Sequence, residues 1–279
     1  MTAKIIDGKQ LAKDIKASLT QEVAALKEKG VVPTIALLLV GDDPASKLYV
    51  NSKAKSTEEI GGKPEVFHLP EDTTLDKIMA LIGRLNQDDS IHGILVQLPL
   101  PEHLHHYEKE IMNSIKPEKD ADAFHPVNIG NLVIGDKCFE GCTAAGCMRL
   151  IDQAGVDLKG KHAVVVGSTI EVGKPITMML FARGVVVTLI HPDTPNLADY
   201  TVKGDLLIVE AQRPGFIKKE MIKPGAIVID AGTSYIDGKT YGDVEAGGAD
   251  VAGWITPVPG GVGPMIIAML MYNLVEAAK

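Results

Sequence analysis

The fold class is indicated most strongly by the stretch Val164-Val165-Val166-Gly167-Ser168-Thr169-Ile170-Glu171-Val172-Gly173-Lys174-Pro175. It reads as a strand, a glycine turn and the start of a helix. This arrangement directs free backbone amides and the positive end of a helix towards a phosphate. Two glycines six residues apart are also what a tight strand-to-helix turn needs for its backbone alone. Because three more strand-like segments follow, we favour a nucleotide-binding turn over a purely structural one.

Short apolar runs recur on both sides of this turn. Residues 34–40 form an unbroken apolar run, which is typical of a parallel strand covered on both faces. Residues 9–30 carry apolar side chains every three to four positions and predict an amphipathic helix that ends at Gly30. The alternation of strands and helices predicts an α/β fold made of βαβ units. The other expected strands are residues 65–69, 93–98, 162–166, 185–190, 205–209 and 226–229.

Two interruptions of this pattern indicate domain boundaries. Pro and Gly residues break any period between 117 and 135, and the Pro/Gly-rich stretch 257–264 precedes a last helix at about 265–277. We therefore expect an amino-terminal βαβ catalytic domain, residues 1–122 together with 262–279, and a Rossmann-type nucleotide-binding domain, residues 123–261. The last helix is long enough to pack back on the first domain.

Composition restricts the class of protein. The 279 residues are 46% hydrophobic and 23% charged, which is typical of globular proteins with two domains or one large one. The 28 Lys and Arg residues against 36 Asp and Glu give a net charge of −8, so we expect no nucleic-acid partner. No signal peptide or membrane-spanning run is recognised, which predicts a cytoplasmic protein without a membrane partner. We expect the three cysteines, Cys138, Cys142 and Cys147, to be buried reduced thiols.

Tyr49 and Lys53 are candidates for acid/base chemistry. They lie four residues apart on a helical stretch, so both side chains project from one face. Partial desolvation disfavours the charged form of an amine, which would suit a Lys to proton transfer near neutrality. The alternative is an incidental pair on a solvated helix face, which is the more common situation for an arbitrary Tyr and Lys.

Three further groups of polar residues stand out. Gln97 lies near the carboxyl end of the expected strand 93–98, where ligands collect in parallel sheets; a Gln satisfied by loop backbone is the alternative. Asp120 or Asp122 could receive the amidine-like edge of a heterocycle, or could be a solvated loop charge or a helix cap. Three histidines within residues 103–106 lack the Cys or paired carboxylate of a familiar metal site. We expect a surface cluster there and no metal.

Four stretches together carry a family resemblance. They are Tyr49-Val50-Asn51-Ser52-Lys53, Gly93-Ile94-Leu95-Val96-Gln97-Leu98-Pro99-Leu100-Pro101, Lys119-Asp120-Ala121-Asp122-Ala123-Phe124 and Thr256-Pro257-Val258-Pro259-Gly260-Gly261-Val262-Gly263-Pro264. In order and spacing they resemble the bifunctional methylenetetrahydrofolate dehydrogenase and methenyltetrahydrofolate cyclohydrolase family. The two long Pro-rich stretches are highly specific to it.

The resemblance implies a particular enzyme of folate one-carbon metabolism. Tetrahydrofolate one-carbon derivatives would bind the first domain and NADP or NAD the second, across a cleft and usually in a homodimer. A hydride would pass from 5,10-methylenetetrahydrofolate to the nicotinamide ring. Water would then open the methenyl cation to 10-formyltetrahydrofolate.

The resemblance also implies roles by position. Lys53 would be the main acid/base group of the hydrolysis, with Tyr49 beside it, and Gln97 would orient Lys53. A neutral amine tolerates the cation left by hydride loss better than an ammonium would. The other implied folate contacts are Asp122 at the pterin edge, Leu98, Pro99, Pro259, Gly260 and Gly261. The implied nucleotide contacts are Gly167, Ser168, Thr169, Val172, Gly173, His191, Thr233 and Gly263.

The nucleotide side departs from the family pattern. Ser168 stands where an Arg is common, and Glu171 stands where an apolar residue is usual. An Arg suits a 2′-phosphate, whereas a Ser offers only a hydroxyl and a Glu adds repulsion. Asp193 could meet a ribose diol, and Arg213 could recover an anion contact, although the sequence does not show its direction. We expect weaker discrimination between NADP and NAD than usual, favouring NAD.

Other functions stay open at this point. The substitutions at Ser168, Glu171 and Gln212 would permit a monofunctional cyclohydrolase with impaired cofactor binding. A catalytically silent, folate-binding regulatory protein would keep the fold, but the intact amino-terminal positions argue against it. A generic amino-acid or shikimate-type dehydrogenase shares the two-domain plan without needing these motifs.

Overall fold

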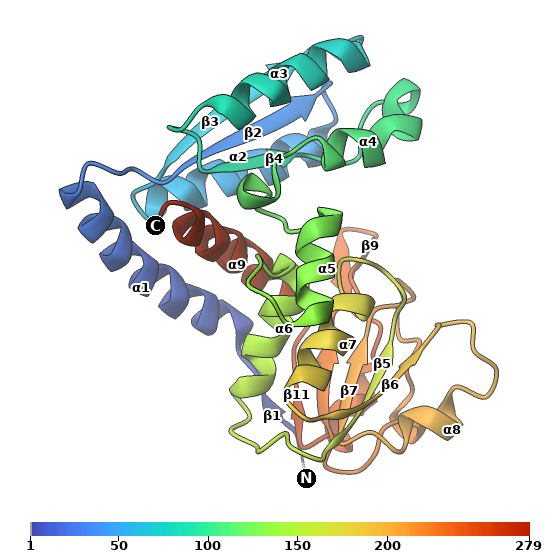
Figure 1. Cartoon of the computed structure of the whole chain (residues 1–279). Coiled ribbons are helices and arrows are strands. Elements are labelled where there is room, and N and C mark those ends of the chain that lie inside the picture. Colours follow the sequence, from blue (N-terminus) through green and yellow to red (C-terminus); the bar gives the residue numbers. More distant parts are fainter. Residues whose placement is uncertain (1) are drawn as a thin grey trace. The chain divides into compact units, whose positions relative to one another are not determined.

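The structure, a computed structural model, describes residues 2–279 and contains two compact units (Figure 1). Unit 1 consists of the residues up to Lys13 and Gly141–Met269, and unit 2 of Asp14–Glu140 and Leu270–Lys279. Two helices, α1 (Gly8–Glu28) and α9 (Val262–Ala277), contribute residues to both units. Both units are α/β, as the alternation of strands and helices predicts.

Unit 1 is built on a six-stranded parallel sheet in the order β1-β11-β8-β7-β5-β6. Val166, at the end of β5, pairs with Ile190 of β6 on one side and Val209 of β7 on the other. The carboxyl ends of these three strands are therefore adjacent, and the strand order reverses at β5. Ligands bind at such a reversal point in doubly wound sheets.

The elements of unit 1 follow the buried apolar runs of the sequence. β5, β7 and β8 are almost wholly buried because the sheet is covered on both faces. A short antiparallel hairpin, β9–β10, follows β8. The strands are β1 (Lys4–Ile5), β5 (His162–Val166), β6 (Val186–Ile190), β7 (Leu206–Val209), β8 (Ile227–Asp230), β9 (Ser234–Ile236), β10 (Lys239–Tyr241) and β11 (Trp254–Ile255). The helices are α6 (Cys142–Asp152), α7 (Gly173–Ala182), α8 (Ala198–Thr201), η3 (Lys219–Met221) and η4 (Ala246–Asp250).

Unit 2 contains a three-stranded parallel sheet in the order β3-β2-β4, flanked by helices (Figure 1). Every residue of β2 is buried, and its alternate side chains at 36, 38 and 40 share one cluster with α3. The opposite face receives the end of α9, where Leu274 lies against Gly93 of β4. The last helix thus packs on this unit. The elements are β2 (Thr34–Val40), α2 (Pro44–Glu59), β3 (Lys63–Leu69), α3 (Leu75–Gln87), β4 (Gly93–Val96), η1 (Glu102–Tyr107), α4 (Glu108–Asn113), η2 (Pro117–Lys119) and α5 (Pro126–Ile134).

The bounds of the two units differ from the boundaries expected at residues 122 and 262. The amino terminus lies in unit 1 because β1 pairs with β11 along the sheet edge. Residues 123–140, including α5, lie in unit 2. The start of α9 lies in unit 1, where the backbone of Gly146 approaches Met265 so closely that a Cβ at Gly146 would sit 2.8 Å from the Met265 Cβ. β1 and β11 are two residues long, which is too short to give a sequence period.

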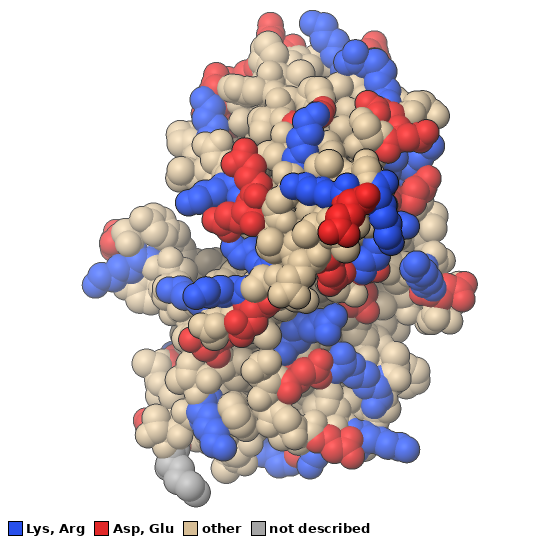
Figure 2. All heavy atoms as spheres, turned by 90° about the vertical axis from the view of Figure 1, so that its left-hand side faces the viewer, with Lys and Arg blue, Asp and Glu red and all other residues tan. Residues whose placement is uncertain are grey.

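The surface carries charges of both signs. On the face drawn in Figure 2, Lys and Arg are interspersed with Asp and Glu over its whole extent. Between residues 2 and 279, no helix combines the length and apolar character needed to cross a membrane. Because the net charge of the chain is −8, any anionic ligand must be held by a local arrangement of donors.

Candidate catalytic and nucleotide-binding sites

In unit 2 the structure brings Lys53 and Gln97 into contact. Lys53 Nζ donates a hydrogen bond of 3.1 Å to Gln97 Oε1. Gln97 follows β4 and is only 8% exposed, and its backbone N donates to Leu38 O at 2.9 Å. Its Nε2 donates to Leu98 O at 2.6 Å. Because a carbonyl accepts only, this bond turns Oε1 towards the amine and fixes the orientation of the Gln97 amide.

The helix that carries Lys53 is set by a cap at its start. Asp43 Oδ1 accepts from Ser46 N at 2.7 Å, and Pro44 occupies the first helical position of α2. Lys53 lies half-buried within this helix, and Tyr49, one turn earlier, is 61% exposed. Leu98 and Pro99, just beyond β4, are exposed as well. The arrangement offers an oriented amine beside an open phenol and an open apolar edge.

The two linker carboxylates, which the sequence left as alternatives, differ in their surroundings. Asp120 is buried, and it accepts from Ala123 N at 3.2 Å and from His125 N at 2.7 Å. Burial raises the pKa of the Asp120 carboxyl, and these backbone hydrogen bonds oppose that shift. Asp120 therefore organises the chain locally. Asp122 is half-buried and is the more accessible carboxylate of the two.

Two of the three histidines of residues 103–106 make backbone contacts. His103 Nε2 donates to Thr73 O at 3.1 Å, and His105 Nε2 donates to Leu100 O at 2.6 Å. Across residues 2–279, no three His, Cys, Asp or Glu side chains converge in a way that could hold a metal ion. These two hydrogen bonds therefore stabilise the conformation of the segment around residues 100–106.

In unit 1 the glycine turn is closely packed. A Cβ at Gly173 would lie 2.4 Å from Gly167 O, so the start of α7 can approach the end of β5 only with glycine at this position. Thr169 Oγ1 accepts from Val172 N at 3.2 Å and holds the turn in shape. Ser168 and Thr169 are half-buried, whereas Val172 is buried. This approach of strand, turn and helix start fits a dinucleotide, whose pyrophosphate needs close backbone amides.

A carboxylate lies under this turn. Glu210, directly after β7, accepts from Thr169 Oγ1 at 2.7 Å, and a Cβ at Gly167 would be 3.1 Å from its Oε2. Burial raises the pKa of Glu210 to about 6, helped by the neighbouring charges of Glu171 and Asp243 and opposed by the Thr169 hydrogen bond. An ionised Glu210 places a negative charge close to Gly167 and Thr169. The sequence does indicate this position, because a charged residue directly follows the apolar run 206–209.

The loop after β7 is anchored from behind. Asp243 accepts hydrogen bonds from three consecutive backbone amides, those of residues 211, 212 and 213. The Asp243 amide in turn donates to Asp230 Oδ1 at 3.0 Å, and Val244 N donates to Asp230 Oδ2 at 2.9 Å. Burial raises the pKa of Asp230 to about 6 against these bonds. These two acids fix the loops around the ends of β7 and β8.

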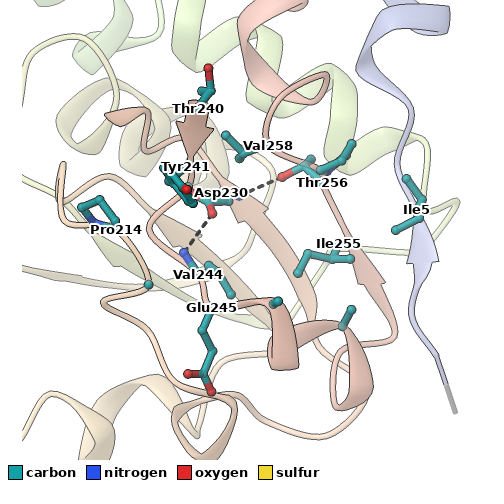
Figure 3. A pocket seen from close by; sticks show the side chains of 15 residues that line it. Ile5, Pro214, Asp230, Thr240, Tyr241, Val244, Glu245, Ile255, Thr256 and Val258 are labelled. Atoms are coloured by element: carbon teal, nitrogen blue, oxygen red, sulfur yellow. Dashed lines mark hydrogen bonds between the residues drawn. The ribbon is translucent and has the colours of Figure 1, made fainter. Parts of the chain in front are cut away.

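A pocket of about 490 Å³ lies beside Asp230 (Figure 3). Its wall includes Ile5, Tyr241, Val244 and Thr256, and Asp230 N donates to Thr256 Oγ1 at 2.8 Å. Pro257 and Val258 of the Pro/Gly-rich stretch 257–264 line this pocket, whereas no residue of the glycine turn 167–173 does. The pocket is therefore separate from the glycine turn.

The Pro/Gly-rich stretch 257–264, which leads into α9, packs against the start of α1. A Cβ at Gly8 would lie 1.9 Å from Gly261 O, and Lys9 N donates to Gly260 O at 3.1 Å. Gly260 has a φ of +111°, which other residues rarely adopt. Pro259 and Gly263 are exposed, and a Cβ at Gly263 would meet open space. The glycines serve the close approach of two backbones in unit 1.

The remaining nucleotide candidates lie along the same edge of the sheet. His191 follows β6 and is exposed, next to the glycine turn because β6 pairs with β5. Thr233 follows β8, which is separated from β5 by β7, and it is also exposed. The structure thus groups six of the expected residues at the ends of β5 and β6, with Thr233 further along the edge.

Comparison with known proteins identifies the family. The family model for the tetrahydrofolate dehydrogenase/cyclohydrolase catalytic domain matches residues 6–122. The family model for the NAD(P)-binding domain matches residues 141–279. The chain belongs to the tetrahydrofolate dehydrogenase/cyclohydrolase family. The family expected from the four stretches, and the expected pairing of a catalytic domain with an NAD(P)-binding domain, are confirmed.

Relatives within the tetrahydrofolate dehydrogenase/cyclohydrolase family match over the full length. The chain is 51% identical over 281 residues to the bifunctional protein FolD of Moorella thermoacetica, covering 100% of both chains. It resembles the crystal structure of the bifunctional enzyme FolD from Campylobacter jejuni, with 45% identity, a TM-score of 0.95 and coverage of 99% and 98%. It also resembles the FolD of Trypanosoma brucei, solved with NADP cofactor and an inhibitor, with 37% identity, a TM-score of 0.91 and coverage of 99% and 97%.

Proposed function

We propose that the chain is a bifunctional methylenetetrahydrofolate dehydrogenase and methenyltetrahydrofolate cyclohydrolase. It oxidises 5,10-methylenetetrahydrofolate with NAD(P) and hydrolyses the methenyl product to 10-formyltetrahydrofolate. The observation that carries the proposal is the Lys53–Gln97 hydrogen bond, because it holds an amine in one orientation beside an open ligand edge. The full-length match to bifunctional FolD proteins supports both activities.

Lys53 moves the proton in the hydrolysis. The hydrogen bond from Lys53 Nζ to Gln97 Oε1 uses one position of the amine and leaves its other positions directed away from Gln97. Lys53 takes a proton from the water as that water attacks the methenyl carbon. When the adduct collapses and its C–N bond breaks, this proton passes to the leaving nitrogen, and the remaining hydroxyl proton passes to solvent as the formyl C=O forms. The Gln97 amide, fixed by its bond to Leu98 O, keeps the amine in place throughout.

The folate contacts are proposed from position and exposure. The open phenol of Tyr49 lies one helical turn from Lys53, and exposed Leu98 and Pro99 supply apolar surface. Asp122, the more accessible of the two linker carboxylates, accepts hydrogen bonds from the pterin edge. Pro259, Gly260 and Gly261 are proposed as further folate contacts.

NAD(P), when bound, supplies the acceptor for the hydride. The turn from Gly167 to Gly173 would hold its pyrophosphate, because backbone amides and the start of α7 meet there. His191, Thr233 and Gly263 are proposed as further contacts with the nucleotide. The close packing of Gly173 on Gly167 preserves this pyrophosphate site, so a monofunctional cyclohydrolase is not favoured.

We also propose that the enzyme works as a cytoplasmic homodimer. Cys138, Cys142 and Cys147 are thiols rather than disulfide partners, which suits a reducing compartment. The dimer rests on the family resemblance alone. Light scattering of the purified protein distinguishes a dimer from a monomer of 29.7 kDa.

The Lys53→Met variant tests the hydrolytic role. General acid–base groups contribute about a hundredfold or more to rate, so we expect cyclohydrolase turnover to fall by at least that factor. Methylenetetrahydrofolate oxidation should remain substantial. Lys55→Met is the matched control, because Lys55 is exposed on the same helix and should change neither rate. Normal hydrolysis by the Lys53→Met variant would overturn the role given to Lys53.

A further inference from the structure

An ion pair joins the loops that follow β6 and β7. Arg213 Nη2 donates to Asp193 Oδ1, and Asp193 Oδ2 lies 3.4 Å from His191 Nδ1. β5 lies between β6 and β7 in the sheet. The pair therefore crosses the carboxyl end of β5, where the glycine turn begins.

Both partners are held in place and remain open to solvent. The Arg213 guanidinium lies 5.2 Å from the centre of the Phe216 ring, and Asp193 N donates to His191 Nδ1 at 3.2 Å. The exposed fractions of the Asp193 and Arg213 side chains are 62% and 47%. The Arg213 hydrogen bond lowers the pKa of Asp193, so this carboxylate is ionised at neutral pH. Asp193 thus keeps acceptor capacity for a ligand, while Arg213 is already paired.

The charges around the turn do not favour an additional phosphate. The segments next to the carboxyl ends of β5, β6 and β7, residues 167–176, 191–197 and 210–214, carry two cations and three carboxylates. They are Lys174, Arg213, Glu171, Asp193 and Glu210. NADP differs from NAD by a 2′-phosphate that brings between about one and a half and two negative charges. A ribose diol, in contrast, donates hydrogen bonds, which a carboxylate accepts well.

We propose that the Asp193–Arg213 ion pair makes this enzyme select NAD over NADP. Asp193 accepts hydrogen bonds from the hydroxyls of the adenosine ribose and holds the Arg213 guanidinium back from a 2′-phosphate. The inference rests on the proposed dehydrogenase function, since it concerns one end of the same nucleotide site.

Replacing Asp193 alone and replacing Arg213 alone should change the affinity for NADP⁺ in opposite directions. Asp193→Asn removes the repulsive carboxylate and frees Arg213, so affinity for NADP⁺ should rise relative to NAD⁺. Arg213→Gln leaves Asp193 without its counter-charge, so affinity for NADP⁺ should fall further. The loop survives the second change because Asp243 holds the backbone amides of residues 211–213.

Calorimetric titration of NAD⁺ and NADP⁺ into the intact protein measures both affinities without turnover. The wild type should bind NAD⁺ more tightly. The ratio of the two dissociation constants should shift at least about fivefold towards NADP⁺ in Asp193→Asn and in the opposite direction in Arg213→Gln. Asp152→Asn is the matched control and should leave the ratio unchanged, because it breaks the similar Asp152–Arg183 pair at the other ends of α6 and α7.

The outcomes separate the inference from the function on which it rests. Tighter binding of NADP⁺ by the wild type, or ratios that shift the same way or not at all, would overturn the role of the ion pair and leave the dehydrogenase standing. Binding of neither nucleotide by the wild type would overturn the proposed dehydrogenase and this inference with it.

Discussion

Replacing Glu210 with Gln should stabilise unit 1 at neutral and alkaline pH. The carboxyl is buried beneath the glycine turn, and its pKa is raised from 4.5 to about 6. Because the folded state resists ionisation, its stability falls as pH rises from below 4.5 to above 6, and the penalty is complete beyond that range. A shift of this size corresponds to about 2 kcal/mol at about 1.4 kcal/mol per unit. Gln removes the charge and can still accept from Thr169.

Chemical denaturation at pH 4 and pH 8 measures this effect. Trp254, the single tryptophan, lies in β11 of unit 1, so its fluorescence follows the unfolding of that unit. We expect Glu210→Gln to exceed the wild type by up to about 2 kcal/mol at pH 8 and to lose this advantage at pH 4. Glu220→Gln, at an exposed position of the same unit, should show no such difference. An equal stability of wild type and Glu210→Gln at pH 8 would refute the reasoning, as would an advantage independent of pH.

Two other predictions concern packing and buried hydrogen bonds. Gly173→Ala should lower the affinity for NAD(P)⁺ and reduce the free energy of unfolding by about 1–3 kcal/mol. The reason is that its Cβ would lie 2.4 Å from Gly167 O. Gly141→Ala, where a Cβ meets open space, is the control, and equal affinities in a titration would contradict the account. Asn273→Leu should destabilise unit 2 by about 2 kcal/mol or more, because Nδ2 donates to two carbonyls, each at 3.0 Å. An unchanged urea midpoint would count against that role of Asn273.

The sequence predicts the long buried strands well because burial on both faces requires an unbroken apolar run. The expected strands at 34–40 and 162–166 coincide with β2 and β5. β1 and β11 escape prediction because two residues carry no period and their pairing depends on a partner some 250 residues away. The exact limits of the two units depend on the same long-range contacts.

The sequence identifies candidate site residues where they belong to a motif. It does not show which partner each side chain faces in the fold. Lys53 and Gln97 stand out from the sequence, and the structure joins them by a hydrogen bond. The partner of Arg213 is not predictable, because it lies 20 residues away on a neighbouring loop. Asp120 and Asp122 look equivalent as sequence, and only the fold shows that backbone amides engage Asp120.

Methylenetetrahydrofolate-dependent reduction of NAD⁺ and NADP⁺, measured in parallel on purified protein, tests the central claim most directly. Reduced nucleotide and methenyltetrahydrofolate are followed separately, so that oxidation and hydrolysis are resolved. We predict turnover with at least one nucleotide, faster with NAD⁺, followed by hydrolysis of the methenyl product. Hydrolysis without reduction of either nucleotide would contradict it and leave a monofunctional cyclohydrolase.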